Sequence, residues 1–253
     1  MSRKNIHDRN RIGSAIDDEQ RMSDATNYHR YQWDLFSRLL GKRIVEIGPG
    51  FGQYTRQIID SGRAVFACDL DQRHLHDLHQ TISSDALQSR QLDLQNPGPA
   101  EHALRDFHGD TAVLLNVLEH IENDVAALAF LRSVVTERGR LILLVPSHQW
   151  LYNGLDQQAG HFRRYTRSSL SKTVTKAGWR PVISRYVNAP GIPGWLVAGI
   201  MSRVLSPKEQ LDAGSTNALV RLYDRWFTGL SRATDPLFSR LCGLSVFLYC
   251  EAN

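Results

Sequence analysis

Strand-like and helix-like segments alternate along most of this 253-residue chain, and that alternation limits the folds open to it more than any other feature. Apolar, β-rich runs lie at 43–47, 64–68, 88–92, 111–115, 140–145 and 181–187, and a last one lies at 244–250. Helical stretches separate several of them, at 54–61, 72–83 and 125–137, and the third is expected to stop at Arg138-Gly139. Segments in this order build a parallel sheet that is covered on both faces. We therefore expect a doubly wound α/β fold.

The same patterning predicts how the chain is divided. Residues 24–40 carry aromatic and aliphatic side chains at helical spacing, and Thr166 is expected to cap a helix that ends near Gly178. Residues 188–243 are loop-rich and helical, and they interrupt the alternation. We expect a flexible N-terminal segment (1–23), a core (24–187), a helical insertion (188–243) and a final strand of the core (244–253).

Composition is that of an ordinary globular protein. The chain has 42% hydrophobic and 22% charged residues, and this composition argues against a fibre or a wholly disordered chain. The cysteines, Cys68, Cys242 and Cys250, are odd in number and lack metal-type spacing, so we expect reduced thiols rather than disulfides. The N-terminus shows no apolar signal region and no run is long enough to span a bilayer, so a cytoplasmic location is expected.

Charge is distributed unevenly along the chain. Residues 160–253 contain 13 Lys and Arg against 5 Asp and Glu, whereas residues 1–159 contain 17 against 21. A basic C-terminal part attracts an anionic substrate, nucleic acid or a membrane surface. A solvated basic face explains the same counts equally well, so charge alone selects no partner.

A glycine-rich run follows the first strand. Gly48, Gly50 and Gly52 are spaced as G-x-G-x-G, and Glu46 stands near the end of the strand. Glycines let the backbone turn sharply and approach a ligand closely, at the sheet edge where such folds bind nucleotides. A dinucleotide fingerprint needs its third glycine at position 53, which is Gln53 here. A nicotinamide-dependent oxidoreductase is therefore a less favoured alternative.

Acidic residues end the next two strands. Asp69 closes the second strand, where a carboxylate can accept hydrogen bonds from ribose hydroxyls, whereas Asp71 is expected to cap the next helix. Asp93 closes the third strand, and chain order alone places it near a bound adenine.

The fourth strand runs into Leu115-Asn-Val-Leu-Glu-His-Ile121 at the same edge. His120 is placed to act as a base or to orient a substrate, although a lone histidine is more often structural. Glu119 is expected to hold a helix start or a basic partner.

These segments together resemble the successive motifs of class I S-adenosylmethionine (SAM)-dependent methyltransferases. They are Glu46-x-Gly48-x-Gly50-x-Gly52, Cys68-Asp69, Leu92-Asp93 and Asn116-Val-Leu-Glu-His-Ile, the last being similar to the ubiquinone-type subgroup. Val145-Pro-Ser and Gly160-His-Phe-Arg-Arg-Tyr-Thr resemble bacterial members of uncertain substrate. The resemblance covers 24–187 well, and it implies a Rossmann-like, seven-stranded sheet whose last strand is antiparallel.

The resemblance also implies how the cofactor is held. Glu46 and the glycines would lie against the methionyl part and the ribose of SAM, while the backbone of Asn116 would lie beside the sulfonium. Asp69 would hold the ribose diol and Asp93 the adenine amino group. The implied cofactor-binding residues are Glu46, Gly48, Pro49, Gly50, Gly52, Asp69, Leu70, Asp93, Leu94, Asn116, Val117 and Tyr28. The product would be S-adenosylhomocysteine, and no metal is expected.

Catalysis and enclosure of the site are assigned to segments expected at the same edge. A base is needed only where the nucleophile loses a proton, and the candidates are His120, His161 and Tyr165. Tyr28, Tyr31 and Trp33 either form part of a lid over the cofactor or are the apolar face of a core helix.

The acceptor is not identified by any motif. The Asn/Asp-Pro-Pro-aromatic pattern used for exocyclic amino groups of nucleic acid is absent, because Asn116 is followed by Val-Leu-Glu. The leading expectation is methyl transfer to an O, N or C nucleophile of a small-molecule acceptor, natural-product or lipid-like. RNA or protein and peptide methylation through the basic C-terminal part is the alternative. The apolar stretch 190–201 is a substrate lid, a homodimer interface or a peripheral membrane contact.

Overall fold

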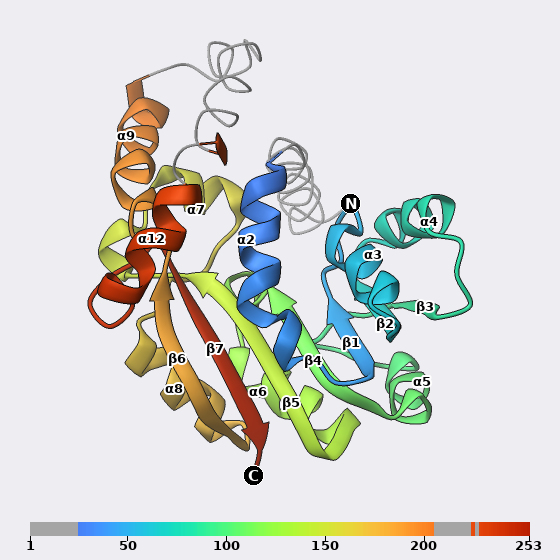
Figure 1. Ribbon diagram of the computed structural model, residues 1–253. Coiled ribbons are helices and arrows are strands. Elements are labelled where there is room, and N and C mark those ends of the chain that lie inside the picture. The colour runs from blue at the N-terminus through green and yellow to red at the C-terminus, as the bar shows by residue number, and fades with distance from the viewer. Residues whose placement is uncertain (1–24, 205–223, 226–227) are drawn as a thin grey trace, which may run out of the picture.

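The computed structural model describes residues 25–204, 224–225 and 228–253, which include one seven-stranded sheet (Figure 1). The strands are β1 (Arg43–Ile47), β2 (Ala64–Asp69), β3 (Leu87–Gln91), β4 (Gly109–Leu115), β5 (Val135–Pro146), β6 (Trp179–Val187) and β7 (Ser245–Ala252). Their order is β3-β2-β1-β4-β5-β7-β6, with β1 to β5 paired in parallel and β7 antiparallel to both of its neighbours. The expected Rossmann-like fold with an antiparallel last strand is confirmed. The expected flexible segment 1–23 lies outside the described residues.

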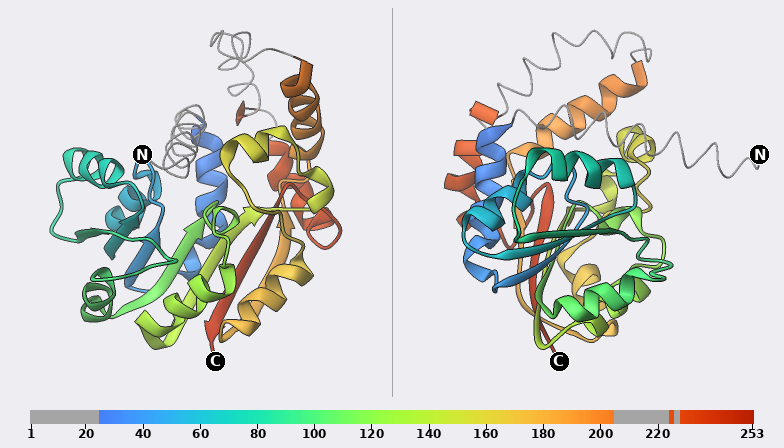
Figure 2. Two further views of the ribbon diagram at one scale, coloured as in Figure 1. Left: turned by 180° about the vertical axis from the view of Figure 1, so that it is seen from behind. Right: turned by 90° about the vertical axis from the view of Figure 1, so that its right-hand side faces the viewer.

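Helices cover both faces of this sheet (Figure 2). They are α2 (Thr26–Phe36), α3 (Gln53–Asp60), α4 (Gln72–Thr81), α5 (Ala100–Phe107), α6 (Asp124–Val134), α7 (Gly154–Ala159), α8 (Arg167–Lys176), α9 (Gly191–Val204) and α12 (Thr228–Phe238), with 3-10 turns η1 (Ser37–Leu39), η2 (Leu118–His120) and η3 (Gln149–Leu151). Helices α2, α3 and α4 contribute to the hydrophobic cluster on one face, and α5, α6 and α8 to that on the other.

Strand alternation explains why two apolar layers form. Successive side chains of a strand point to opposite faces, so Phe66 and Cys68 of β2 join one cluster while Val65 and Ala67 join the other. All four are buried, as expected for a strand inside a parallel sheet. The core therefore fixes the parallel strands in one register, and their carboxyl ends meet along one edge.

Two expectations about helix ends are confirmed and one is wrong. Asp71 caps α4, and Thr166 caps α8 as part of a capping box. The helix expected over 125–137 ends earlier, at Val134, and β5 begins at once. Val135 pairs with Gly109 of β4, and Gly139 has no positive φ, so this glycine does not cap the helix. The buried, β-branched Val135 extends the strand instead.

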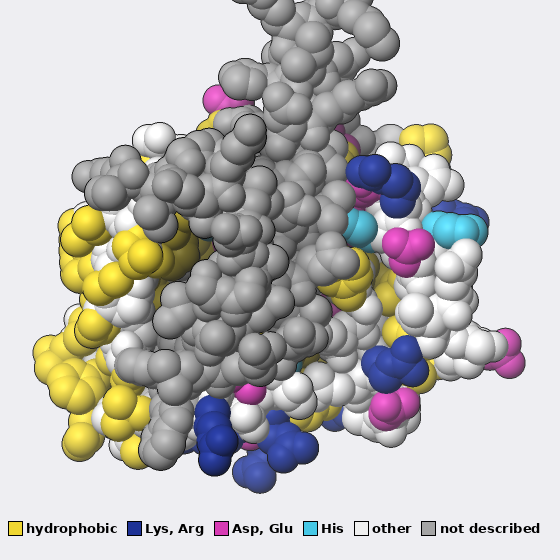
Figure 3. Space-filling view, turned by 90° about the horizontal axis from the view of Figure 1, so that it is seen from above, with side chains coloured by type: hydrophobic (Ala, Val, Ile, Leu, Met, Phe, Trp, Pro, Cys, Tyr) yellow, Lys and Arg dark blue, Asp and Glu magenta, His cyan; other side chains and the backbone are white. Residues whose placement is uncertain are grey.

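The described part of the insertion packs against the core through two helices. Helix α12 contacts β6 and α2, and α9 contacts α7. Exposed hydrophobic side chains gather where these helices lie (Figure 3), and they include Leu196, Val197, Ile200 and Met201 of α9 and Leu230, Leu237 and Phe238 of α12. The described helices include none that is long and apolar enough to cross a membrane. A lid, a homodimer interface and a peripheral membrane contact stay predictions for this stretch.

Candidate active site

The glycine-rich turn after β1 has the backbone that its spacing predicts. Gly48, Gly50 and Gly52 have φ of 68°, 52° and 77°, which is the left-handed region that glycine adopts without strain. The amide of Gly48 donates to the carbonyl of Cys68 at 2.8 Å, so the turn is held against β2. A Cβ on Gly48 would lie 2.6 Å from Val117 Cγ2. The turn therefore lies directly against the segment that follows β4.

Glu46 lies at the base of this turn. Its carboxylate accepts a hydrogen bond from Thr55 Oγ1 of α3 at 2.6 Å, and only 3% of the residue is exposed. Gly52 is the N-cap of α3 and Gln53 is the first residue of that helix. Burial raises the pKa of the Glu46 carboxyl to about 7, although the hydrogen bond from Thr55 acts in the opposite direction.

The acid at the end of β2 is fixed by its own loop. Asp69 Oδ1 accepts a hydrogen bond from the amide of Asp71 at 2.8 Å, and Asp69 Oδ2 lies 3.3 Å from His74 Nδ1. Asp71 turns away, because it accepts from the amide of Arg73 and pairs with that side chain. The Arg73 guanidinium lowers the pKa of Asp71 to about 2. Asp69 is thus the acid that remains at the sheet edge.

The next loop places the second expected acid. Asp93 Oδ1 accepts a hydrogen bond from the amide of Gln95 at 2.8 Å in the turn after β3. Of the two leucines in the expected cofactor set, Leu70 is 55% exposed, whereas Leu94 is 7% exposed and packs in the core. The surface of Leu70 is therefore open to a ligand and that of Leu94 is mostly covered.

Asn116 turns the chain out of the sheet after β4. Its φ is 55°, a conformation that residues other than glycine adopt rarely, and its amide donates to the carbonyl of Leu144 at 2.7 Å. Val117 follows and lies against Gly48. Within the glycine turn, the amide of Gly52 donates to the carbonyl of Pro49. This turn and the segment that begins at Asn116 therefore lie next to each other at the carboxyl edge of the sheet.

The aromatic residues of α2 face inward. Tyr28 and Tyr31 stack with their ring centroids 6.2 Å apart, and Trp33 packs edge-on against Phe36 at 5.3 Å. Tyr31 is 3% exposed and its hydroxyl donates to Asp235 of α12. Of the two interpretations left open by the sequence, these contacts favour the apolar face of a core helix for Tyr31 and Trp33.

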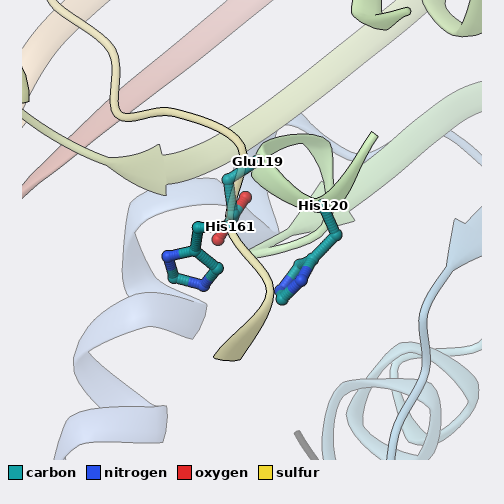
Figure 4. Close-up of side chains that lie close together, drawn as sticks. All are labelled: Glu119, His120 and His161. Carbon is teal, nitrogen blue, oxygen red and sulfur yellow. The ribbon is translucent and has the colours of Figure 1, made fainter. Parts of the chain in front are cut away.

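Beyond Asn116 the chain turns through η2, and there Glu119 and His120 meet His161 (Figure 4). One carboxylate oxygen of Glu119, one ring nitrogen of His120 and one ring nitrogen of His161 all lie within 4.8 Å of one another. The two imidazole rings pack edge to face, with centroids 4.6 Å apart and planes at 82°. The amide of Phe162 donates to the carbonyl of Glu119 at 2.8 Å, which joins the two segments. The structure therefore brings both candidate histidines together.

Glu119 is the most enclosed member of this cluster. It is 1% exposed, and within the described residues its Oε2 has no hydrogen-bond partner. Burial raises the pKa of the Glu119 carboxyl to about 7, while the charges of His161 and Arg164 act in the opposite direction. As for the two expectations for Glu119, it lies in the first turn of η2 although Asn123 caps α6, and its basic neighbours are His161 and Arg164.

A second buried carboxylate supports the cluster. His161 Nδ1 lies 2.7 Å from Asp156 Oδ1, and Arg164 Nε donates to the same oxygen at 2.8 Å. Burial by itself would raise the pKa of Asp156, but the hydrogen bonds from His161 and Arg164 outweigh it and lower the pKa. The Arg164 guanidinium also lies 4.5 Å from the ring centroid of Trp195 on α9. The insertion thus contacts the segment that carries His161.

Tyr165 is placed away from this cluster. Its hydroxyl donates to Asp124 Oδ2 at 2.9 Å, and the residue is 2% exposed within the core. Burial and the Asp124 charge both raise the pKa of Tyr165. The geometry gives no support to Tyr165 as a base that contacts substrate.

Residues 45–141 match a protein-family model that is described as a methyltransferase domain. That match begins within β1 and ends within β5. A curated relative, ribosomal RNA small subunit methyltransferase A of Corynebacterium glutamicum (strain R), is 27% identical over 136 residues, and the match covers 46% of each protein. The chain thus matches less than half of that relative's length.

Solved structures share the fold of this chain at low sequence identity. The 1,6-didemethyltoxoflavin-N1-methyltransferase of Burkholderia thailandensis, with S-adenosylhomocysteine bound, is 16% identical with a TM-score of 0.58, over 96% of this chain and 85% of that one. An S-adenosylmethionine-dependent methyltransferase of Mesorhizobium loti is 14% identical with a TM-score of 0.56, over 87% and 97%.

A solved structure with this fold holds S-adenosylhomocysteine, and the described residues of this chain fit a cofactor of that kind. Three left-handed glycines leave the backbone of the turn after β1 uncovered by a side chain at positions 48, 50 and 52. Asp69 and Asp93 stand at successive strand ends beside that turn, and Leu70 is exposed next to Asp69. The edge therefore offers carboxylates for hydroxyl and amino groups beside an apolar surface.

Sequence reasoning missed three members of the site. Glu119 was not among the candidate catalytic residues, although its position beside His120 was a usable signal. Asp156 and Arg164 carried no such signal, because they reach His161 only when α7 and the following loop fold.

Proposed function

We propose that the protein transfers the methyl group of SAM to an O, N or C nucleophile of a small-molecule acceptor that binds beside Glu119, His120 and His161. The position of this cluster carries the proposal. Turn η2 follows Asn116 and Val117 directly, and Val117 lies against the glycine turn assigned to the cofactor. A methyl group presented along this edge would therefore face the cluster.

SAM supplies a methyl group that is already activated on a sulfonium, so the task of the protein is mostly positioning. Asp69, Asp93 and Leu70 are assigned to the nucleoside, and Glu46 and the glycine turn to the rest of the cofactor. His120 and His161 are assigned to the acceptor, which they orient and whose proton they can receive. Asp156 fixes the His161 ring for that task, since it holds Nδ1 at 2.7 Å.

Enclosure of the cluster supports a small acceptor. Glu119 is 1% exposed and the His161 side chain 14%, so little of either residue is open to a ligand within the described part of the chain. Nucleic acid binding relies on Lys and Arg that are free to contact phosphates. The arginines on the His161 segment are engaged instead, Arg163 with Asp124 at 3.0 Å and Arg164 with Asp156 at 2.8 Å. A natural-product or lipid-like acceptor agrees with this geometry.

RNA is the second candidate acceptor. It is supported by the partial match to a ribosomal RNA methyltransferase and by the basic residues of 160–253. RNA retention that falls steeply with salt, together with methyl transfer to that RNA, would favour it over a small molecule. Binding that is independent of salt, or absent, would count against it.

Calorimetric titration with SAM and with S-adenosylhomocysteine tests whether the protein binds the proposed cofactor. Asp69→Ala is expected to weaken SAM binding by about 1–3 kcal/mol, the scale of a lost hydrogen bond to a charged group. Asp77→Ala is the matched control, because Asp77 is an exposed acid on the neighbouring helix α4. Mass spectrometry of small-molecule panels incubated with SAM then identifies the acceptor. Absence of SAM binding by the folded wild-type protein would overturn the proposal.

A further inference from the structure

We infer that Glu119, His120 and His161 form a binding site for a divalent transition-metal cation. Their candidate ligand atoms lie within 4.8 Å of one another at the acceptor side of the edge. The inference rests on the proposed function and deepens it: with a cation bound, the histidine lone pairs are on the ion, and the ion rather than the imidazoles holds the acceptor. Cation binding itself requires neither SAM nor acceptor, so the two ideas can fail separately.

The donor set selects the kind of cation. One carboxylate oxygen and two imidazole nitrogens are the ligands of many zinc and non-haem iron sites, and they leave coordination positions open. Mg²⁺ and Ca²⁺ prefer sites made of oxygen atoms. With metal–ligand bonds of about 2.0–2.2 Å, tetrahedral ligands lie about 3.3 Å apart. Because Asp156 holds the His161 ring, an ion would draw the three atoms to that spacing mainly through rotation of the partly exposed His120 on its short turn.

His161 is oriented as a ligand. The Asp156 carboxylate, which also pairs with Arg164, accepts a hydrogen bond from His161, so the proton of neutral His161 sits on Nδ1. The lone pair is then on Nε2. A carboxylate behind the ring in this way fixes the tautomer and direction of metal-binding histidines. This contact is independent of the spacing of the three ligand atoms.

Glu119 supplies a second independent observation. Its Oε2 is buried without a hydrogen-bond donor in the described part of the chain, and an ionised carboxylate in that condition is costly. The neighbouring arginines pair with other acids, Arg164 with Asp156 and Arg163 with Asp124. A bound cation would compensate the charge of Glu119 and occupy its free oxygen.

The open positions of such a cation would face the acceptor. The His161 side chain is 14% exposed and His120 is partly exposed, so the site is reachable from solvent. A Lewis-acidic ion at this place would hold an oxygen atom of the acceptor. The inference therefore favours acceptors with a hydroxyl, carboxylate or phosphate oxygen beside the methylated atom.

Titration of the tag-free, chelator-treated full-length protein tests the inference without SAM or acceptor. Co²⁺, followed by its visible absorption, and Zn²⁺, followed by calorimetry, are expected to bind at one equivalent and more tightly than Mg²⁺. Glu119→Gln, His120→Ala and His161→Asn should each weaken this binding at least tenfold. Asp156→Asn should weaken it by about 10–100-fold through the His161 ring. His102→Ala, at an exposed histidine of α5, is the control that should bind like the wild type.

Circular dichroism on the same samples distinguishes a variant that has lost cation binding from one that has not folded. The variants of His120 and His161 add a second safeguard, because these side chains are partly exposed and their replacement removes no buried charge. Wild-type protein that is folded but binds no Co²⁺ or Zn²⁺ overturns the inference. Binding that survives in all three ligand variants also overturns it, since the ion is then held elsewhere. SAM titration of these samples reports on the proposed function. If the wild type binds SAM but no cation, only this inference is overturned. If it binds the cation but not SAM, only the proposed function is overturned.

Discussion

At the scale of single residues, Gly48 shows how a missing side chain shapes the cofactor edge. Alanine at this position would need φ near 68° and would place its Cβ 2.6 Å from Val117 Cγ2. We expect Gly48→Ala to lower the free energy of unfolding by about 1–3 kcal/mol and to weaken SAM binding as well. Urea denaturation measures the first effect and calorimetry the second.

Gly62→Ala is the control for the Gly48 substitution. Gly62 has φ of 80°, but a Cβ there would meet nothing within 4 Å. It should show backbone strain of about 1–2 kcal/mol and unchanged SAM affinity. Wild-type SAM affinity in Gly48→Ala would mean that the turn does not approach the cofactor.

Glu46 predicts how stability depends on pH. Burial raises its pKa in the folded protein to about 7 from a reference of 4.5, so between these values the folded state binds the proton more tightly than the unfolded state. The contribution of protonated Glu46 to the free energy of unfolding is complete below pH 4.5 and is lost as the pH rises through 7. Glu46→Gln should reduce the fall in stability over this range by on the order of 2–3 kcal/mol. Urea titrations of both proteins at pH 5 and pH 8, without ligand, measure the difference; equal falls would contradict the prediction.

The residues that sequence predicted correctly are those whose role is local. The glycine turn follows from backbone freedom, and Asp71 as a cap follows from its place before a helix. Asp156 is different, because its contact with His161 depends on how α7 and the next loop fold. The burial of Tyr165 against Asp124 of α6 is likewise a tertiary property that a local stretch of sequence does not show.

At the scale of elements, buried β-branched runs were predicted well and short helices were not. All seven strands were anticipated, and those buried on both faces, such as β2 and β4, are apolar over most of their length. Helix α5 has 8 residues and α7 has 6, which is too short for a clear 3.6-residue period. At the boundary of α6 and β5, pairing of Val135 with Gly109 overrode the local stop signal at Gly139. Neither pairing nor packing is visible in a local window.

At the scale of the whole molecule, α2, at the start of the described chain, packs against α12, which precedes the last strand (Figure 1). Asp235 of α12 accepts hydrogen bonds from the Tyr31 hydroxyl and, at 3.0 Å, from the amide of Asn188. Asp224 accepts from the amide of Tyr28 at 2.7 Å, at the start of α2, where a carboxylate is favoured by the free amides of the helix. These contacts join residues about 200 positions apart, so the insertion and α2 stabilise each other.

Asp235→Ala should therefore loosen both helices and leave the sheet intact. The substitution removes the acceptor for the buried Tyr31 hydroxyl and the Asn188 amide, and we expect a loss of about 2–4 kcal/mol. Hydrogen exchange should speed up in α2 and α12 but not in β4 or β5.

Asp34→Ala is the matched control, because Asp34 also links α2 to α12, through Arg232 at 2.6 Å, but its side chain is 50% exposed. An exposed ion pair contributes little, so this variant should stay within about 0.5 kcal/mol of the wild type. Equal exchange in the two variants would mean that the buried contact does not hold these helices together.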